Sequence, residues 1–203
     1  MRELTIDQYL RQLADRVPAP GGGAVAALHA AQGAALVAMA ARYSTGEGHA
    51  EAAARITAEA DALRAAALRL AEEDAETFTA VTEAYRLPSG TAEEQAVRSA
   101  AVAGELVRAA RPPAEVVGAA DRIVALAEEL LSFANPRLLS DVAAASDAAR
   151  AAATTARLNV EINLAGVTDA AAREPLSAAA ARTDAIAERA DRLAATVRER
   201  IAG

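Results

Sequence analysis

The chain has 203 residues, of which 62 are alanine and only 2% are aromatic, and its formal net charge is −7. An acidic chain with few aromatics lacks the basic, stacking surface that nucleic-acid binding requires. Cysteine is absent and all 21 basic residues are arginine, which excludes thiol catalysis, disulfides, iron–sulfur clusters and lysine Schiff bases. Only two histidines, His29 and His49, are present, so we expect no histidine-rich metal site.

The composition favours an all-α protein. Alanine is the best helix former and a small side chain, so we expect closely packed helices with a core of Leu, Val, Ile and Ala. Gly and Pro fall at breaks between helix-length segments, and no repeat or linker-like stretch is present, which predicts one domain over residues 1–203. The first 17 residues are charged and amphipathic, unlike a secretory signal, so we expect a cytoplasmic protein.

The breaks predict a bundle of about seven helices. Two capping boxes, Thr5 with Gln8 and Thr91 with Glu94, mark helix starts. The expected helices span residues 5–17, 23–44, 49–87, 91–111, 113–134, 136–165 and 169–201, with breaks that include the Pro112–Pro113 pair. The third helix would be about 58 Å long if straight. The alternation in "LNVEINL", residues 158–164, is typical of a strand, but a lone strand would have no partner, so we expect a helix there.

Residues 17–44, "VPAPGGGAVAALHAAQGAALVAMAARYS", carry no fixed charge up to Ala41. A membrane span is possible by length, but alanine contributes little to insertion and polar residues and glycines interrupt the segment. A dinucleotide- or phosphate-binding loop would need a preceding strand or a Gly-Lys-Ser/Thr sequence, and neither is present. The pattern instead predicts a helix buried on all sides. The glycines at its N-terminus either form only a tight turn or let a ligand approach the free N–H groups.

Asp74 interrupts an apolar stripe on the third predicted helix. The stripe is formed by Leu63, Ala67, Leu70, Phe78, Val81 and Tyr85, and Asp74 fills its gap. The neighbouring Glu72, Glu73 and Glu76 project from other faces of the helix. Burial raises a carboxyl pKa toward the range that acid–base catalysis uses, although an ion pair with an arginine or a helix kink would also explain the position.

Polar residues also interrupt the apolar pattern of the helix predicted over residues 136–165. Asn159 and Asn163 lie one turn apart on a stripe shared with Ala152 and Ala156, so these amides either join helices or bind a ligand. Asn135, Ser140 and Asp141 surround the start of the same helix, where helix capping explains at least one of them.

Five motifs together resemble the formiminotransferase-cyclodeaminase C-terminal family. They are "PAPGGGAVAAL", "GAALVAMAAR", "EDAETFTAVTEAYRLP", "NPRLLSD" and "LNVEINL", in this order and spacing. The resemblance covers nearly the whole chain. It implies an all-helical homodimer that acts on the one-carbon unit bridging N5 and N10 of tetrahydrofolate, with no metal and no cofactor beyond the folate substrate.

The resemblance also assigns candidate site residues. It implies that Asp74 is the catalytic acid–base group. It further implies a substrate-binding set of Pro20, Gly21, Gly22, Gly23, Asn135, Asp141, Asn159 and Asn163. The family's usual residues are replaced at several positions: Ala24 stands for Ser, Ala134 for Gly and Glu161 for Arg, and "STGEGHAEA" lacks a basic run.

The expected function is therefore hydrolysis of 5,10-methenyltetrahydrofolate to 10-formyltetrahydrofolate, or cyclisation of 5-formiminotetrahydrofolate with loss of ammonia. The alternative is a non-catalytic helical dimer, either a scaffold or a binder of a folate-like ligand, that kept the fold but lost the activity.

Overall fold

The computed structural model describes residues 2–202 and confirms the all-α prediction, because all regular structure in this range is helical. The helices are α1 (Ile6–Ala14), α2 (Gly22–Arg42), α3 (Ala50–Tyr85), α4 (Ala92–Leu131), α5 (Leu139–Leu164), α6 (Ala170–Ala181) and α7 (Thr183–Ala202). A short 3₁₀ turn, η1 (Pro136–Leu138), precedes α5. Both capping boxes form, at Thr5 and at Thr91, and residues 158–164 are helical as expected.

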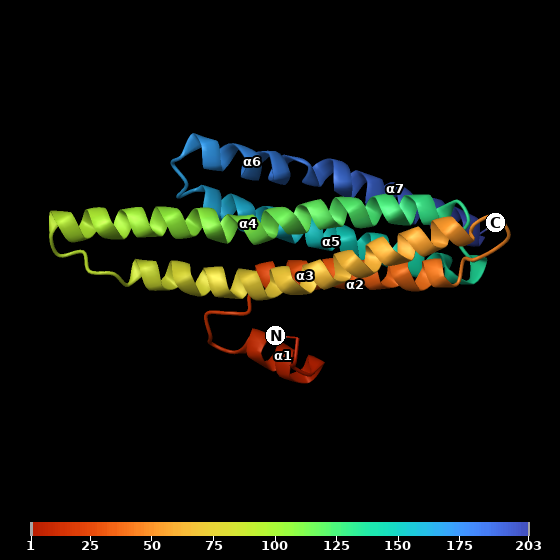
Figure 1. Cartoon of the computed structure of the whole chain (residues 1–203), viewed down its shortest axis with the longest axis horizontal. Coiled ribbons are helices and arrows are strands. Elements are labelled where there is room, and N and C mark those ends of the chain that lie inside the picture. Colours follow the sequence, from red (N-terminus) through yellow and green to blue (C-terminus); the bar gives the residue numbers. More distant parts are fainter. Residues whose placement is uncertain (1, 203) are drawn as a thin grey trace.

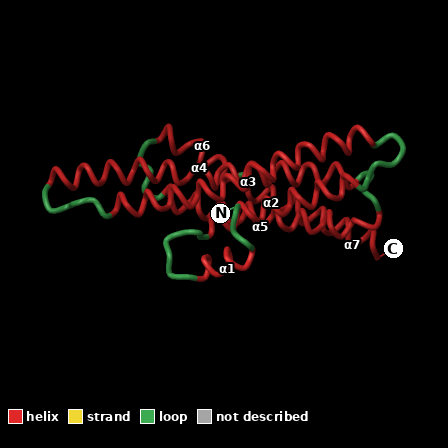
Figure 2. The backbone as a smooth tube through the Cα atoms, turned by 60° about the horizontal axis from the view of Figure 1, so that its bottom comes forward, coloured by secondary structure: helices red, strands yellow, loops and turns green. Residues whose placement is uncertain are grey.

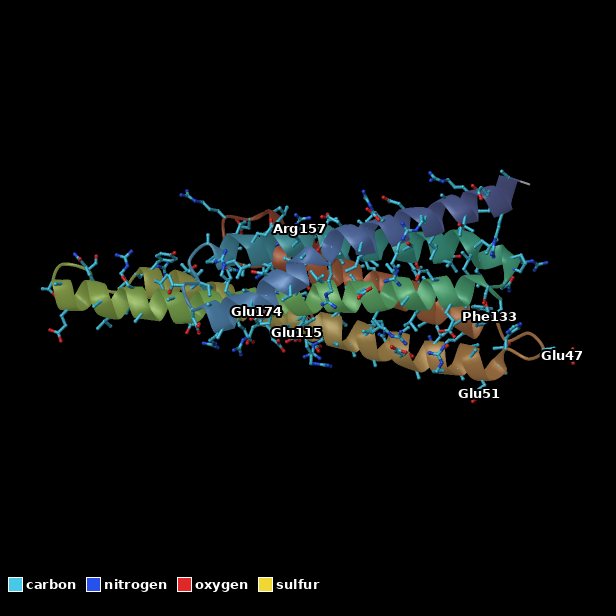
Figure 3. All side chains as sticks on the ribbon, turned by 90° about the horizontal axis from the view of Figure 1, so that it is seen from above. Glu47, Glu51, Glu115, Phe133, Arg157 and Glu174 are labelled. Carbon is cyan, nitrogen blue, oxygen red and sulfur yellow. The ribbon has the colours of Figure 1, made fainter. Side chains whose placement is uncertain are left out.

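Helices α2 to α5 pack side by side, and α6 and α7 run along α4 and α5 (Figure 1). The end of α3 and the start of α4 project beyond the other helices as a two-helix arm, which is clear in Figures 1 and 2. The short α1 lies apart from the bundle and contributes no buried residue. Charged side chains cover the outside, as Glu47 and Glu51 do at the end where α3 begins (Figure 3).

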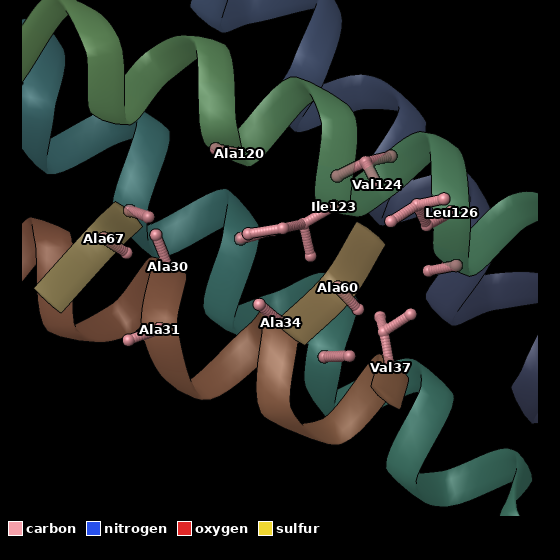
Figure 4. Close-up of a cluster of buried hydrophobic side chains, with 14 of the residues drawn as sticks. Ala30, Ala31, Ala34, Val37, Ala60, Ala67, Ala120, Ile123, Val124 and Leu126 are labelled. Carbon is pink, nitrogen blue, oxygen red and sulfur yellow. The ribbon is translucent and has the colours of Figure 1, made fainter. Parts of the chain in front are cut away.

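The uncharged stretch forms α2, which is largely buried. Alanines of α2 face α3 and α4 in a core that contains few large side chains (Figure 4). A Cβ atom on Gly33 would lie 2.9 Å from the Ala145 carbonyl oxygen of α5, so only glycine allows this approach. By length and hydropathy α2 could cross a membrane, but 61% of its most apolar window is buried inside the bundle, as a core helix requires.

The predicted break at Pro112–Pro113 is wrong, because α4 continues through both prolines. A proline inside a helix removes the N–H that would bond the carbonyl four residues earlier. For Pro113 that carbonyl belongs to Ala109, and the side-chain amide of Asn163 donates to it over 3.2 Å. Both prolines are buried, so packing also stabilises the continuous helix. The helix predicted over residues 169–201 is instead two, α6 and α7, which meet at Arg182.

Candidate active site

A pocket of about 290 Å³ lies where the N-terminus of α2 meets α3, α4 and α5. Its lining consists of Pro18, Ala19, Gly21, Gly22, Gly23, Asp74, Thr77, Phe78, Ala109, Asn159, Ile162 and Asn163. Helical geometry explains this convergence, since Asp74, Thr77 and Phe78 share one face of α3. On α5, Asn159, Ile162 and Asn163 likewise lie three or four residues apart.

Asp74 packs directly on the glycine turn. A Cβ atom on Gly23 would lie 1.9 Å from Oδ1 and 2.4 Å from Cγ of Asp74, so any side chain at position 23 would displace the carboxylate. The glycine turn and Asp74, about 50 residues apart in the sequence, are therefore in direct contact. Gly22 lies next to Asn159, since a Cβ atom at position 22 would make an ordinary contact with its Nδ2 at 3.5 Å. Gly21 begins the helix without any side-chain cap.

Burial raises the pKa of Asp74 from 3.8 to about 6. The backbone N–H of Ala24, at the positive end of the α2 dipole, faces the carboxylate and lowers the same pKa by a smaller amount. No arginine forms an ion pair with Asp74 in the part of the chain that the structure describes. The structure therefore shows a carboxyl group that changes charge near neutral pH and faces a cavity.

The amide nitrogens of the two pocket asparagines donate to backbone carbonyls. Asn163 Nδ2 donates to the Ala109 and Asn159 carbonyls, at 3.2 and 2.9 Å. Asn159 Nδ2 donates to the Thr155 carbonyl over 2.9 Å. These bonds fix the amide orientations, because a flipped amide would place oxygen against oxygen. Each Oδ1 is therefore the atom left to accept from a ligand, so the pair can recognise N–H donors.

Apolar side chains flank the mouth of the pocket. Phe78 is 49% exposed and Ile162 is 72% exposed, although both are large hydrophobic residues. The sequence pattern placed Phe78 in the core stripe and gave Ile162 no role. Their exposure beside a polar pocket suits a flat, partly apolar ligand whose ring can lie against them.

Three candidate residues lie elsewhere. Pro20 follows a cis peptide bond and is buried behind the turn, where it contributes to a neighbouring cavity with Glu76 of α3. Asn135 caps η1, and its backbone N–H bonds to Ser44 Oγ just beyond the C-terminus of α2. Asp141 lies in the first turn of α5. Since α2 spans about 30 Å from the glycine turn to that end, the structure of one chain does not bring Asn135 or Asp141 to the Asp74 pocket.

The replaced family positions differ in their distance from this pocket. Ala24 is fully buried, and its backbone N–H faces Asp74. Glu161 lies outside it and pairs with Arg157 at 2.7 Å. Ala134 and residues 44–52, "STGEGHAEA", lie at the far end of α2.

These features define a helical-bundle protein with a small-ligand pocket and one titrating carboxyl group. The family model described as formiminotransferase-cyclodeaminase matches residues 5–182, and the chain belongs to that family. It is 34% identical over 174 residues to a methenyltetrahydrofolate cyclohydrolase of Methylorubrum extorquens, with 84% of each chain covered.

Two further similarities extend the comparison. The chain is 33% identical over 165 residues to the mouse formimidoyltransferase-cyclodeaminase, covering 79% of this chain and 30% of that longer protein. The crystal structure of the formiminotetrahydrofolate cyclodeaminase from Thermotoga maritima matches with a TM-score of 0.82 and 26% identity, over 97% of this chain and 98% of that one.

Proposed function

We propose that this protein is a folate one-carbon enzyme that hydrolyses 5,10-methenyltetrahydrofolate to 10-formyltetrahydrofolate. The observation that carries the proposal is Asp74, a partly buried carboxyl group whose pKa is about 6, facing a pocket at a glycine-rich helix N-terminus. The relative from Methylorubrum extorquens, which matches this chain over 84% of both sequences, bears the name of that activity.

Asp74 can transfer each proton that the hydrolysis requires. Its carboxylate takes a proton from the water that attacks the carbon between N5 and N10, giving a tetrahedral intermediate. The acid then returns that proton to N5 as the carbon–N5 bond breaks. The hydroxyl proton of the intermediate leaves through Asp74 to solvent as the formyl carbonyl forms. A group with a pKa near neutral pH is efficient in both directions.

The remaining pocket atoms have binding roles in this proposal. The Oδ1 atoms of Asn159 and Asn163 accept from N–H groups of the pterin, and Phe78 and Ile162 cover its ring. Gly23 leaves the space that the Asp74 carboxylate occupies beside the N-terminus of α2. Water addition and carbon–N5 cleavage, assisted by one proton-transfer group, involve no change of oxidation state, so we propose that no metal and no cofactor beyond the folate substrate is needed.

Cyclisation of 5-formiminotetrahydrofolate is the second candidate, and the match to the Thermotoga maritima cyclodeaminase favours it. There N10 attacks the formimino carbon, and Asp74 carries a proton from N10 to the departing ammonia. The intermediate is again a tetrahedral carbon between N5 and N10, so the same pocket suits both reactions.

The test is the decay of methenyltetrahydrofolate absorbance with wild-type protein and with Asp74→Asn. The amide keeps the shape of the carboxyl group but cannot titrate. We expect wild-type turnover above the spontaneous rate and a fall of about 10²–10⁴-fold in the variant. Ammonia release from 5-formiminotetrahydrofolate distinguishes the second candidate. Wild-type protein inactive in both assays supports a non-catalytic scaffold or folate-like ligand binder.

We also propose that the enzyme is a cytoplasmic homodimer. Half-buried apolar residues of α2, Val25, Leu28, Leu36 and Met39, remain on its outer face. Beside them, α1 exposes Ile6 and Leu10, which share a cavity with Leu28. Apolar side chains gathered over two helices are typical of a subunit interface, and a second copy would cover both faces.

A further inference from the structure

Tyr9 is the feature of the structure that the proposed reaction leaves unexplained. Its hydroxyl oxygen is fully buried, and it has no hydrogen-bond partner among residues 2–202. An unpaired buried hydroxyl costs free energy, and most such groups in folded proteins have a partner. The hydroxyl of Tyr9 is therefore available to donate a hydrogen bond to a partner in another state of the protein.

The position of Tyr9 points to that partner. Tyr9 lines a cavity of about 280 Å³ between α1 and the bundle, together with Leu28 of α2 and Ala71 of α3. Ala71 precedes Asp74 by one helical turn, and Leu28 follows Ala24 by one turn. Tyr9 thus shares a cavity with residues that lie one helical turn from the two residues that meet at the candidate site. Burial raises the pKa of Tyr9, and the negative charge of Asp74 raises it further, as expected for neighbouring groups.

Contacts before α1 hold this arrangement in place. Arg2 pairs with Glu72, with Nε 2.9 Å from Oε2 and Nη2 2.7 Å from the same oxygen, two residues before Asp74. The Thr5 capping box then fixes the start of α1. These contacts anchor one end of α1, and no residue of the helix is fully buried against the bundle.

We propose that Tyr9 is a positioning residue of the Asp74 site, its hydroxyl donating a hydrogen bond to the Asp74 carboxylate when α1 settles onto α2 and α3 over bound substrate. The bond would hold the carboxylate toward the reacting carbon and stabilise its charged form. This inference rests on the proposed function, because it adds a second residue to the same site.

Few other groups can produce a pH effect at Asp74. The N-terminal half of α2 carries no Asp, Glu or Arg, and its one titratable side chain is His29, while α4 and α5 contribute Ala109, Asn159 and Asn163 at the pocket. On α3, Glu73 and Glu76 are exposed, and Glu72 pairs with Arg2. On α1, Asp7 and Arg11 pair with each other at 2.9 Å on the exposed side. Tyr9 is therefore the group whose removal should change the titration of Asp74.

The first experiment needs no activity. The chain has three tyrosines and no tryptophan, so an isotope label at tyrosine Cζ gives three NMR signals, which Tyr→Phe variants assign. In protein saturated with tetrahydrofolate, the Tyr9 signal should change with pH around 6 in the wild type and should not do so in Asp74→Asn. Tyr43 and Tyr85, which are exposed, serve as internal controls. If the pH dependence of the Tyr9 signal is the same in wild-type protein and in Asp74→Asn, the proposal is overturned, even if the enzyme is active. If the protein is inactive but its Tyr9 signal still depends on Asp74, only the proposed function is contradicted.

The second experiment compares Tyr9→Phe with Tyr85→Phe in the turnover assay. Tyr9→Phe should lower kcat by about 10-fold with a smaller change in KM, less than the loss expected for the acid–base group itself. It should also move the acid limb of the kcat profile to higher pH, because the charged form of Asp74 loses a donor. Tyr85→Phe should behave like wild type. A lower melting temperature for Tyr9→Phe with an unchanged pH profile would show that Tyr9 acts only in packing.

Discussion

The Asp74 carboxylate occupies the space that a side chain at Gly23 would fill, since a Cβ atom there would lie 1.9 Å from Oδ1. One glycine therefore determines how closely the acid approaches the N-terminus of α2. Burial by this contact raises the Asp74 pKa, and the same contact brings the carboxylate within reach of the Ala24 N–H. Two segments far apart in the sequence thus form one titrating unit.

Gly23→Ala should move the Asp74 carboxylate away from the N-terminus of α2. The methyl group would push the carboxylate toward solvent, so we expect turnover to fall by about 10²-fold, as for other small misplacements of a reacting group. The pKa of Asp74 should move back toward its ordinary value. Turnover and the pH dependence of kcat measure both effects. Gly104→Ala is the matched control, because a Cβ atom at Gly104 meets nothing within 4 Å. Equal activity of the two variants would contradict the steric argument.

Asp74→Asn should stabilise the protein at neutral pH but not in acid. The pKa of Asp74 is about 6 in the folded protein and 3.8 in the reference state, so the folded chain holds its proton more tightly. This stabilising contribution is complete below about pH 4 and is lost as the pH rises to about 6. Above that pH the charged carboxylate costs up to about 3 kcal/mol relative to the unfolded chain.

Denaturant unfolding of the wild-type protein and Asp74→Asn from pH 4 to pH 8 checks the direction of this change in stability. The difference in the free energy of unfolding should grow in favour of the Asp74→Asn variant across the window. A variant that is less stable at every pH would indicate that the carboxylate mainly caps α2.

Alanine substitutions of the two pocket asparagines should distinguish effects on stability from effects on substrate binding. Asn163→Ala removes the donor to the Ala109 carbonyl, which Pro113 cannot bond, so we expect a loss of about 1–3 kcal/mol in stability together with a higher KM. Asn159→Ala removes a bond to the Thr155 carbonyl of its own helix, where the backbone ladder already provides a donor. It should therefore raise KM with little change in melting temperature. Similar melting temperatures for both variants would contradict the role given to Pro113.

Ile6→Glu should dissociate the proposed homodimer. Ile6 is 80% exposed in one chain, so the charge should leave a single chain stable, whereas inside a subunit interface it would be buried without a partner. Val97→Glu is the control, since Val97 is 60% exposed on the projecting arm. Sedimentation velocity at micromolar concentration should show wild-type and Val97→Glu dimers and Ile6→Glu monomers. A monomeric wild-type protein would remove the basis for the dimer.

Local sequence signals predict some of these features and miss others for identifiable reasons. Thr5 and Thr91 act through residues three positions away, so their capping boxes can be read from the sequence. The break at Pro112–Pro113 was wrong because the compensating donor, Asn163, comes from another helix. Such a donor leaves no trace near the prolines.

In the candidate site too, some residues can be predicted from the local sequence and others cannot. Asp74 could be singled out because a carboxyl group on an apolar stripe is unusual on its own helix. Tyr9 gave no such signal, since a tyrosine on an amphipathic helix is ordinary until its hydroxyl is found buried. Motif order also does not say which end of a helix a residue occupies, so the separation of about 30 Å between the Asp74 pocket and Asn135 or Asp141 within one chain cannot be read from the sequence.

The alanine-rich interior around α2 changes which substitutions the protein can tolerate. Cores of Leu and Phe are damaged mainly by truncation, but alanine has little to lose, and here the neighbouring helix backbones already touch at Gly33. Added methyl groups must therefore push whole helices apart. A saturation mutagenesis of α2 should thus show Ala→Val and Ala→Leu as more harmful than Ala→Gly at the buried positions, the reverse of the size preference of most protein cores.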